Sequence, residues 1–270
     1  MMLAFVKILR PLNGLMAVFA VLISAFMVNF PFDYTLVLAC LVVFLVSGGG
    51  MVLNEYFDYE IDKINKPKRP LPSKKISRNV ALIYAIVLLI VANILVVFLN
   101  FNLFLFTIFN TILLIIYSWK LKKTPLIGNL TVSWLAASTF LFGSLLKGVL
   151  TATIVILFMM AFLSNVAREI IKTIEDMKGD KKLKAKTIPL LFGEKAAAWI
   201  AIFFIFLGII ATPFPYALGL VNIYYAAFIA IADLVFAASI FFIFVSPKKS
   251  QKYMKIGMII ALVAFLVGVF

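Results

Sequence analysis

The chain has 270 residues, of which 65% are hydrophobic and 13% are charged, and its mean hydropathy is +1.15. Soluble domains carry about 25% charged residues, so the composition excludes an ordinary soluble fold and predicts an all-α integral membrane protein. The absence of His excludes His-ligated metals and His-based catalytic triads, and the single Cys excludes an internal disulfide. A bound metal would therefore be a hard cation held by oxygen atoms.

Nine apolar stretches are each long enough for a bilayer-crossing helix, which needs about 20 residues. We place them in chain order at residues 12–30, 36–54, 79–99, 102–119, 126–146, 150–170, 194–213, 220–244 and 253–270. Stop signals such as Pro31 and Pro215 separate them. We therefore expect one polytopic membrane domain over residues 1–270.

The positions of the charged residues predict on which side of the membrane each loop lies. With nine spans, the N-terminus and every second loop share one side, which holds 24 of the 25 Lys and Arg residues; Lys147 falls on the other side. Because positive charge gathers in cytoplasmic loops, we expect a cell-membrane protein with a cytoplasmic N-terminus and an external C-terminus. The net charge of +14 is then a topology signal, and no nucleic-acid partner is needed to explain it.

Two acidic clusters, in the predicted cytoplasmic loops after the second and sixth spans, hold 8 of the 11 acidic residues. In the first cluster, Asn54, Asp58 and Asp62 follow at intervals of four, so a helix would bring their oxygen atoms to one face. Mg²⁺ favours one or two carboxylates together with the phosphate oxygens of a substrate. The spacing therefore predicts a Mg²⁺ site that also binds a diphosphate.

The second cluster repeats this spacing with Arg168, Lys172, Asp176 and Asp180. The two cations would neutralise phosphate oxygens, and the two carboxylates would hold a metal. The alternative is an ion pair between Lys172 and Asp176 on a solvated helix face, worth about 0.2–0.5 kcal/mol. The presence of two such clusters on one membrane face favours the metal interpretation.

Further candidates for substrate binding are predicted to lie at the same depth in the membrane as the two acidic clusters. Arg69 follows the first cluster in a loop with three prolines, and its guanidinium suits phosphate oxygens. The others open the first span or close the fourth: Arg10, Asn13, Tyr117, Lys120 and Lys122. An interfacial anchor is the alternative for Arg10, and an aromatic belt is the alternative for Tyr117. Asp233, in the middle of the eighth span, is either functional or a protonated acid bonded between helices.

The NxxxDxxxD motif from Asn54 to Asp62 and the DxxxD motif from Asp176 to Asp180 resemble those of the UbiA superfamily of intramembrane prenyltransferases. The resemblance covers nearly the whole chain. It implies nine helices around a central cavity, with helical cytoplasmic caps that carry the motifs. It also implies that a prenyl group passes from a diphosphate to an acceptor with the help of Mg²⁺.

Residues 54–73 and 168–180 are most similar to an archaeal branch of that family, although an acid is common in the branch where this chain has Thr173. The resemblance implies geranylgeranyl diphosphate as donor and geranylgeranylglyceryl phosphate, a glycerol ether, as acceptor. An aromatic acceptor such as 4-hydroxybenzoate or a quinone precursor is the alternative. A transporter would carry charge at mid-membrane, where only Asp233 is expected. The oligomeric state is not predicted.

Overall fold

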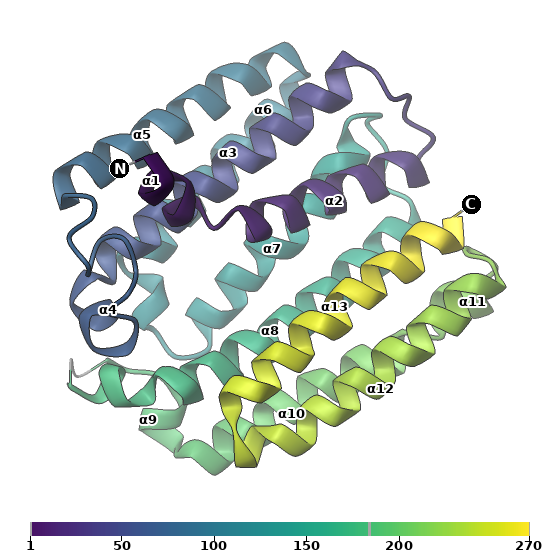
Figure 1. Ribbon diagram of the computed structural model, residues 1–270. Coiled ribbons are helices and arrows are strands. Elements are labelled where there is room, and N and C mark those ends of the chain that lie inside the picture. The colour runs from purple at the N-terminus through teal and green to yellow at the C-terminus, as the bar shows by residue number, and fades with distance from the viewer. Residues whose placement is uncertain (1, 183–184, 270) are drawn as a thin grey trace. The chain divides into compact units, whose positions relative to one another are not determined.

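The computed structural model describes residues 2–182 and 185–269, and every regular element in these two ranges is a helix (Figure 1). This confirms the all-α prediction. Contacts within the chain divide it into two compact units. Unit 1 comprises Met1–Lys122 and Leu141–Val149, and unit 2 comprises Lys123–Phe140 and Leu150–Phe270.

Unit 1 is built around one long helix, α3. Its elements are α1 (Met2–Leu9), α2 (Pro11–Met27), α3 (Tyr34–Phe57), α4 (Tyr59–Asn65), α5 (Arg78–Leu95), the 3₁₀ helix η1 (Val96–Phe98) and α6 (Phe101–Trp119). Helix α3 packs against α1, α2, α5 and α6, and Figure 1 shows it running between α5 and α2. The 3₁₀ helix η2 (Leu121–Lys123) and α7 (Ile127–Leu145) cross the division between the units.

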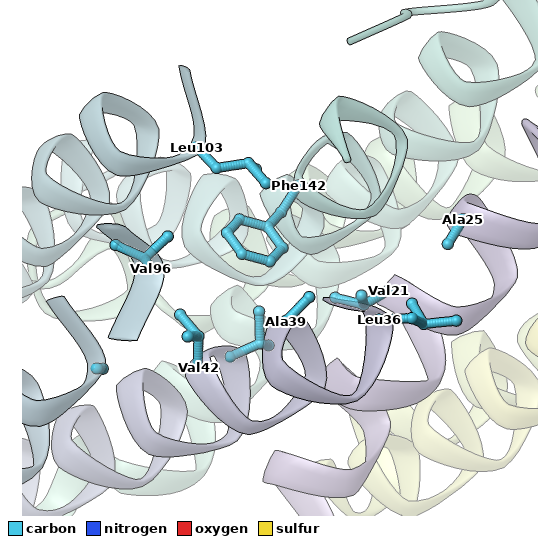
Figure 2. Packing of buried hydrophobic residues seen from close by; sticks show 10 residues of the cluster. Val21, Ala25, Leu36, Ala39, Val42, Val96, Leu103 and Phe142 are labelled. Carbon is cyan, nitrogen blue, oxygen red and sulfur yellow. The ribbon is translucent and has the colours of Figure 1, made fainter. Parts of the chain in front are cut away.

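Small and β-branched side chains form the apolar core of unit 1. The buried cluster comprises Val21, Ala25, Leu36, Ala39, Val42, Val43, Ala92, Val96, Leu103 and Phe142. Figure 2 shows the ring of Phe142 pointing towards Ala39 of α3. Because most of these side chains are short, α2, α5 and α6 approach the first half of α3 closely.

Consecutive glycines bring two helices against α3 just before the first acidic motif. A Cβ atom on Gly49 would lie 2.9 Å from Leu89 of α5, and one on Gly50 would lie 2.7 Å from Leu114 of α6. Such approaches are closer than ordinary van der Waals contact, so a side chain at either position would displace the leucine that packs there. The two glycines therefore let leucines of α5 and α6 pack closely on α3 about one turn before Asn54.

Unit 2 is a bundle of long helices. Its elements are α8 (Ala152–Lys182), α9 (Ile188–Phe192), α10 (Glu194–Ala211), α11 (Phe214–Ala217), α12 (Ile223–Val245) and α13 (Pro247–Val269). Helices α12 and α13 form an antiparallel pair, and α8 packs against both α10 and α13. The Asp233 carboxyl of α12 lies 2.7 Å from the hydroxyl of Thr212, which follows α10. Asp233 thus accepts a hydrogen bond from the end of α10, and its protonation and any functional role stay predictions.

Each of the nine predicted spans corresponds to one helix, and residue 270 of the last span lies outside the described residues. By length and composition, however, seven described helices could cross a membrane, or eight if the bent pair α1–α2 forms one span. Helix α2 alone has 17 residues. Helix α7 carries polar side chains, including Asn129, Thr131 and Ser133, that lower its hydropathy. The count of nine spans is therefore not confirmed.

Candidate active site

The first acidic motif lies where α3 meets α4. Asn54 is in the last turn of α3, Asp58 stands between the two helices, and Asp62 is in α4. The amide of Asp58 donates to the Asn54 carbonyl at 2.9 Å, and the amide of Asp62 donates to the Asp58 carbonyl at 2.7 Å. The α-helical hydrogen-bond spacing therefore continues through the junction, as the intervals of four in the sequence predicted.

Cations from two other segments contact the carboxylates of this motif. Asp58 and Asp62 are only 6% and 3% exposed. The Lys122 ammonium pairs with Asp58, and the Arg69 guanidinium pairs with Asp62. The side-chain oxygen of Asn54 is buried and has no hydrogen-bond partner among the residues that the structure describes. Five of the residues proposed from the sequence thus meet in unit 1.

The oxygen atoms of this motif suit Mg²⁺ when a phosphate completes its coordination. No group of three or more His, Cys, Asp or Glu residues within the described ranges could hold a metal by itself. The motif supplies two carboxylates and the unpartnered oxygen of Asn54. Mg²⁺ characteristically binds one or two carboxylates and takes its remaining ligands from water and substrate phosphates. The donor set therefore fits a metal that arrives with a diphosphate.

Arg10 and Asn13 also lie against α3. Arg10 separates α1 from α2, which are bent by 50°, because a residue before proline disfavours helical geometry and Pro11 follows it. The side chains of Arg10 and Asn13 reach the sulfur of Met51 at 3.7 and 3.6 Å. The Arg10 guanidinium lies 3.8 Å from the carboxylate of Glu55. Both residues are therefore held close to the first motif.

The three candidates at the end of α6 have different environments. Tyr117 is 3% exposed, so its ring belongs to the helix packing. Lys120 is exposed, and Lys122 turns inward to Asp58. Of the two lysines, Lys122 is thus the one that the structure joins to the acidic motif.

The second acidic motif lies on α8, which continues without interruption to Lys182. The apolar span placed at residues 150–170 is therefore the first part of a longer helix, and the stripe expected from Arg168 to Asp180 lies on its continuation. Residues 168–182 lack proline and contain many good helix formers, chiefly Lys, Glu and Met. These residues carry the helix beyond its apolar part, and the intervals of four from Arg168 to Asp180 consequently fall along a single helix.

A buried glutamate organises the cations of the second motif. Glu169 is 6% exposed, and its two carboxylate oxygens each lie 2.7 Å from a cation, one on Arg168 and the other on Lys172. Asp180 is 7% exposed and Asp176 is half-buried. Both predicted cations thus share one carboxylate that is not among the predicted metal ligands.

Glu55 and Glu169 were not among the site residues proposed from the sequence. Helical periodicity could have shown that both glutamates are buried. Glu55 follows Gly48 and Val52 at helical intervals, and Glu169 lies three residues after Val166. These neighbours are buried, so the periodicity places both glutamates on the packed faces of their helices. A buried carboxylate on such a face requires a cation or a hydrogen-bond donor.

A model of the UbiA prenyltransferase family matches residues 15–265. The chain belongs to the UbiA prenyltransferase family. Digeranylgeranylglyceryl phosphate synthase from Methanosphaera stadtmanae is 40% identical over 269 residues, which cover 98% of both chains. The protein with the same name from Pyrococcus furiosus is 42% identical over 269 residues, covering 98% of this chain and 96% of the relative. The family resemblance inferred from the two motifs is confirmed.

Solved structures of UbiA proteins share the fold. A structure of digeranylgeranylglyceryl phosphate synthase in membranes has a TM-score of 0.78 and 37% identity, with 99% of this chain and 98% of that chain covered. A UbiA homologue from Archaeoglobus fulgidus bound to GPP and Mg²⁺ has a TM-score of 0.75, 19% identity and 98% coverage of both chains. The chain is accordingly a multi-pass membrane protein with the helical fold of the UbiA prenyltransferases.

Proposed function

We propose that this prenyltransferase transfers a geranylgeranyl group from geranylgeranyl diphosphate to geranylgeranylglyceryl phosphate, forming an archaeal ether lipid. The observation that carries the proposal is 40–42% identity to digeranylgeranylglyceryl phosphate synthases across nearly the entire chain. The arrangement of Asn54, Asp58 and Asp62 in unit 1 supports it, because these oxygen donors suit a metal that binds together with a diphosphate.

Both acidic motifs would serve this reaction, with the whole chain acting as one domain. Asn54, Asp58 and Asp62 would hold one Mg²⁺, and Asp176 and Asp180 would hold another. Bound Mg²⁺ supplies positive charge that makes the diphosphate a better leaving group. The related Archaeoglobus fulgidus protein, which binds GPP and Mg²⁺, supports the use of Mg²⁺ together with a prenyl diphosphate.

The chain's own cations would bind the remaining phosphate oxygens. Arg69, Arg168 and Lys172 would contact the diphosphate, and the first of these offers a planar fork of donors that matches phosphate geometry. As the bond between C1 and the diphosphate oxygen breaks, positive charge develops on the allylic carbon. The apolar helices would keep water away from this carbon while it reacts.

The acceptor would attack C1 through its free glycerol hydroxyl, which loses its proton as the ether bond forms. Its phosphate would bind to polar side chains near the ends of the first and fourth predicted spans: Arg10, Asn13, Tyr117, Lys120 and Lys122. Lys122 and Arg10 have the strongest support, because both already contact carboxylates at or beside the first motif. The charge distribution favours a cytoplasmic site and N-terminus, with the C-terminus outside the cell membrane.

The choice of acceptor tests the proposal. Purified protein in detergent is incubated with geranylgeranyl diphosphate and Mg²⁺, and pyrophosphate release is measured with geranylgeranylglyceryl phosphate or with 4-hydroxybenzoate. We expect turnover with the phosphorylated glycerol ether and none when EDTA removes the metal. Turnover with the aromatic acceptor alone would contradict the proposed substrate and favour an aromatic prenyltransferase.

A further inference from the structure

Glu55 is one of the most buried charged residues of unit 1, with a relative exposure of 1%. One carboxylate oxygen accepts a hydrogen bond from the backbone amide of Leu71 at 2.9 Å. The other oxygen lies 3.8 Å from the Arg10 guanidinium. Glu55 thus connects the end of α3 with the break between α1 and α2 and with the proline-rich loop that follows α4.

The amide of Leu71 is an unusual donor, because it lies between Pro70 and Pro72, which have no amide hydrogen. The Leu71 side chain is buried at 1% exposure, although it belongs to a loop. Tight turns surround it, with the amide of Ser73 donating to the carbonyl of Arg69 at 3.0 Å. Anchoring Leu71 therefore fixes the backbone two residues away, at Arg69.

Arg69 is the residue of this loop that reaches the acidic motif, where its guanidinium pairs with Asp62. The far end of the loop is held separately, because the Arg78 guanidinium lies 4.9 Å from the ring of Tyr56 and 5.0 Å from the ring of Tyr59. Between these two ends, the bond from the Leu71 amide to Glu55 ties the middle of the loop to α3, together with the buried side chain of Leu71. A free loop would let Arg69 sample many positions at a cost in binding entropy.

We infer that Glu55 is a positioning residue, which anchors the loop of residues 66–77 through the Leu71 amide and so presents Arg69 to the diphosphate. Arg10 keeps the Glu55 side chain in this orientation. The inference rests on the proposed function for the role of Arg69, but the anchoring itself requires no substrate. Glu55 would act through Arg69 and would contact neither the metal nor the transferred group.

Hydrogen–deuterium exchange of the full-length protein in detergent tests the anchoring without any substrate. Glu55→Met removes the acceptor oxygen and keeps an unbranched side chain, whereas Glu55→Gln keeps an oxygen that accepts from the Leu71 amide. Glu60→Met is the matched control, because Glu60 is exposed and pairs with Lys63 on the surface of α4. We expect exchange in the peptide containing Leu71 to accelerate about tenfold in Glu55→Met, and to stay near the wild-type rate in the other two variants.

Kinetics then test the connection to Arg69. We expect Glu55→Met to raise the KM for geranylgeranyl diphosphate about tenfold, and Glu55→Gln to restore most of the affinity. If Glu55 acts through Arg69, the double variant Glu55→Met/Arg69→Gln will bind the diphosphate no more weakly than Arg69→Gln alone. Independent, multiplying effects of the two substitutions would overturn the role in positioning Arg69.

The two measurements separate failure of the anchor from failure of the proposed reaction. Wild-type exchange around Leu71 in Glu55→Met would overturn the inference, whatever reaction the protein catalyses. Equally accelerated exchange in α3 and α5 would also overturn it, because Glu55 would then stabilise unit 1 as a whole. Accelerated exchange confined to residues 66–77 in a protein without prenyltransferase activity would support the anchor and contradict the proposed function.

Discussion

The two acidic motifs share one spacing but obtain their cations in different ways. In the first motif, Asp58 pairs with Lys122, which is 64 residues away, and Asp62 pairs with Arg69 in a loop. In the second motif, Glu169 pairs with its sequence neighbour Arg168 and with Lys172 one turn along the same helix. The ion pairs of the first motif join different elements of the fold, whereas the ion pairs described for the second motif join residues of α8 alone.

This difference indicates which motif is more sensitive to distant changes. The first motif depends on the packing of α3 against its neighbours and on the anchored loop, so substitutions far along the chain can displace its cations. The pairs that Glu169 forms with Arg168 and Lys172 join residues of a single helix. Residues three apart, such as Glu169 and Lys172, are neighbours on a helix surface, so the helix itself brings this pair together.

The largest expected difference between the motifs concerns stability. Arg69→Gln leaves the Asp62 carboxylate, whose side chain is 4% exposed, without its guanidinium, and should destabilise unit 1 by about 3 kcal/mol. Arg168→Gln removes one charged hydrogen bond from the buried Glu169 but leaves Lys172 on that carboxylate, and should cost about 1.5 kcal/mol. Thermal unfolding of both variants in the same detergent measures the difference. Equal shifts in unfolding temperature for the two variants would contradict the predicted difference in stability between the motifs.

A smaller difference is expected in metal binding. Lys122 lies on a carboxylate that we propose as a metal ligand, so Lys122→Met should remove a competing positive charge and increase Mg²⁺ affinity about tenfold. Lys172 pairs with Glu169, which is outside the proposed metal ligands, and Lys172→Met should change the affinity much less. Calorimetric titration of Mg²⁺ without substrate measures both values. Weaker metal binding by Lys122→Met would show that Lys122 supports the site and does not compete for it.

Local patterns in the sequence predicted most of the fold and the motifs themselves. Each apolar stretch coincides with a long helix in the part of the chain that the structure describes, and the backbone hydrogen bonds from Asn54 to Asp62 keep the predicted interval of four residues. The same spacing led to the expectation of a stripe on α8, which the continuous helix bears out. These features follow from helix geometry within about ten residues, so they can be read without knowledge of the tertiary structure.

The partners of the buried carboxylates could not be predicted in the same way. Lys122 was grouped with Lys120 at the end of a span, and only the fold distinguishes the lysine that reaches Asp58 from the exposed one. The bond between Glu55 and the Leu71 amide joins residues 16 positions apart through a loop that has no periodicity. Helical periodicity could have identified Glu55 as buried, but it could not have named the groups that satisfy its charge.

The central claim is that both acidic motifs serve one Mg²⁺-dependent prenyl transfer. The most direct measurement is pyrophosphate release from geranylgeranyl diphosphate, with geranylgeranylglyceryl phosphate and Mg²⁺, by the variants Asp58→Asn and Asp176→Asn. Unfolding temperatures in detergent verify that each variant is folded. We predict that turnover falls at least about 100-fold in each variant. Wild-type turnover in either folded variant would contradict the claim.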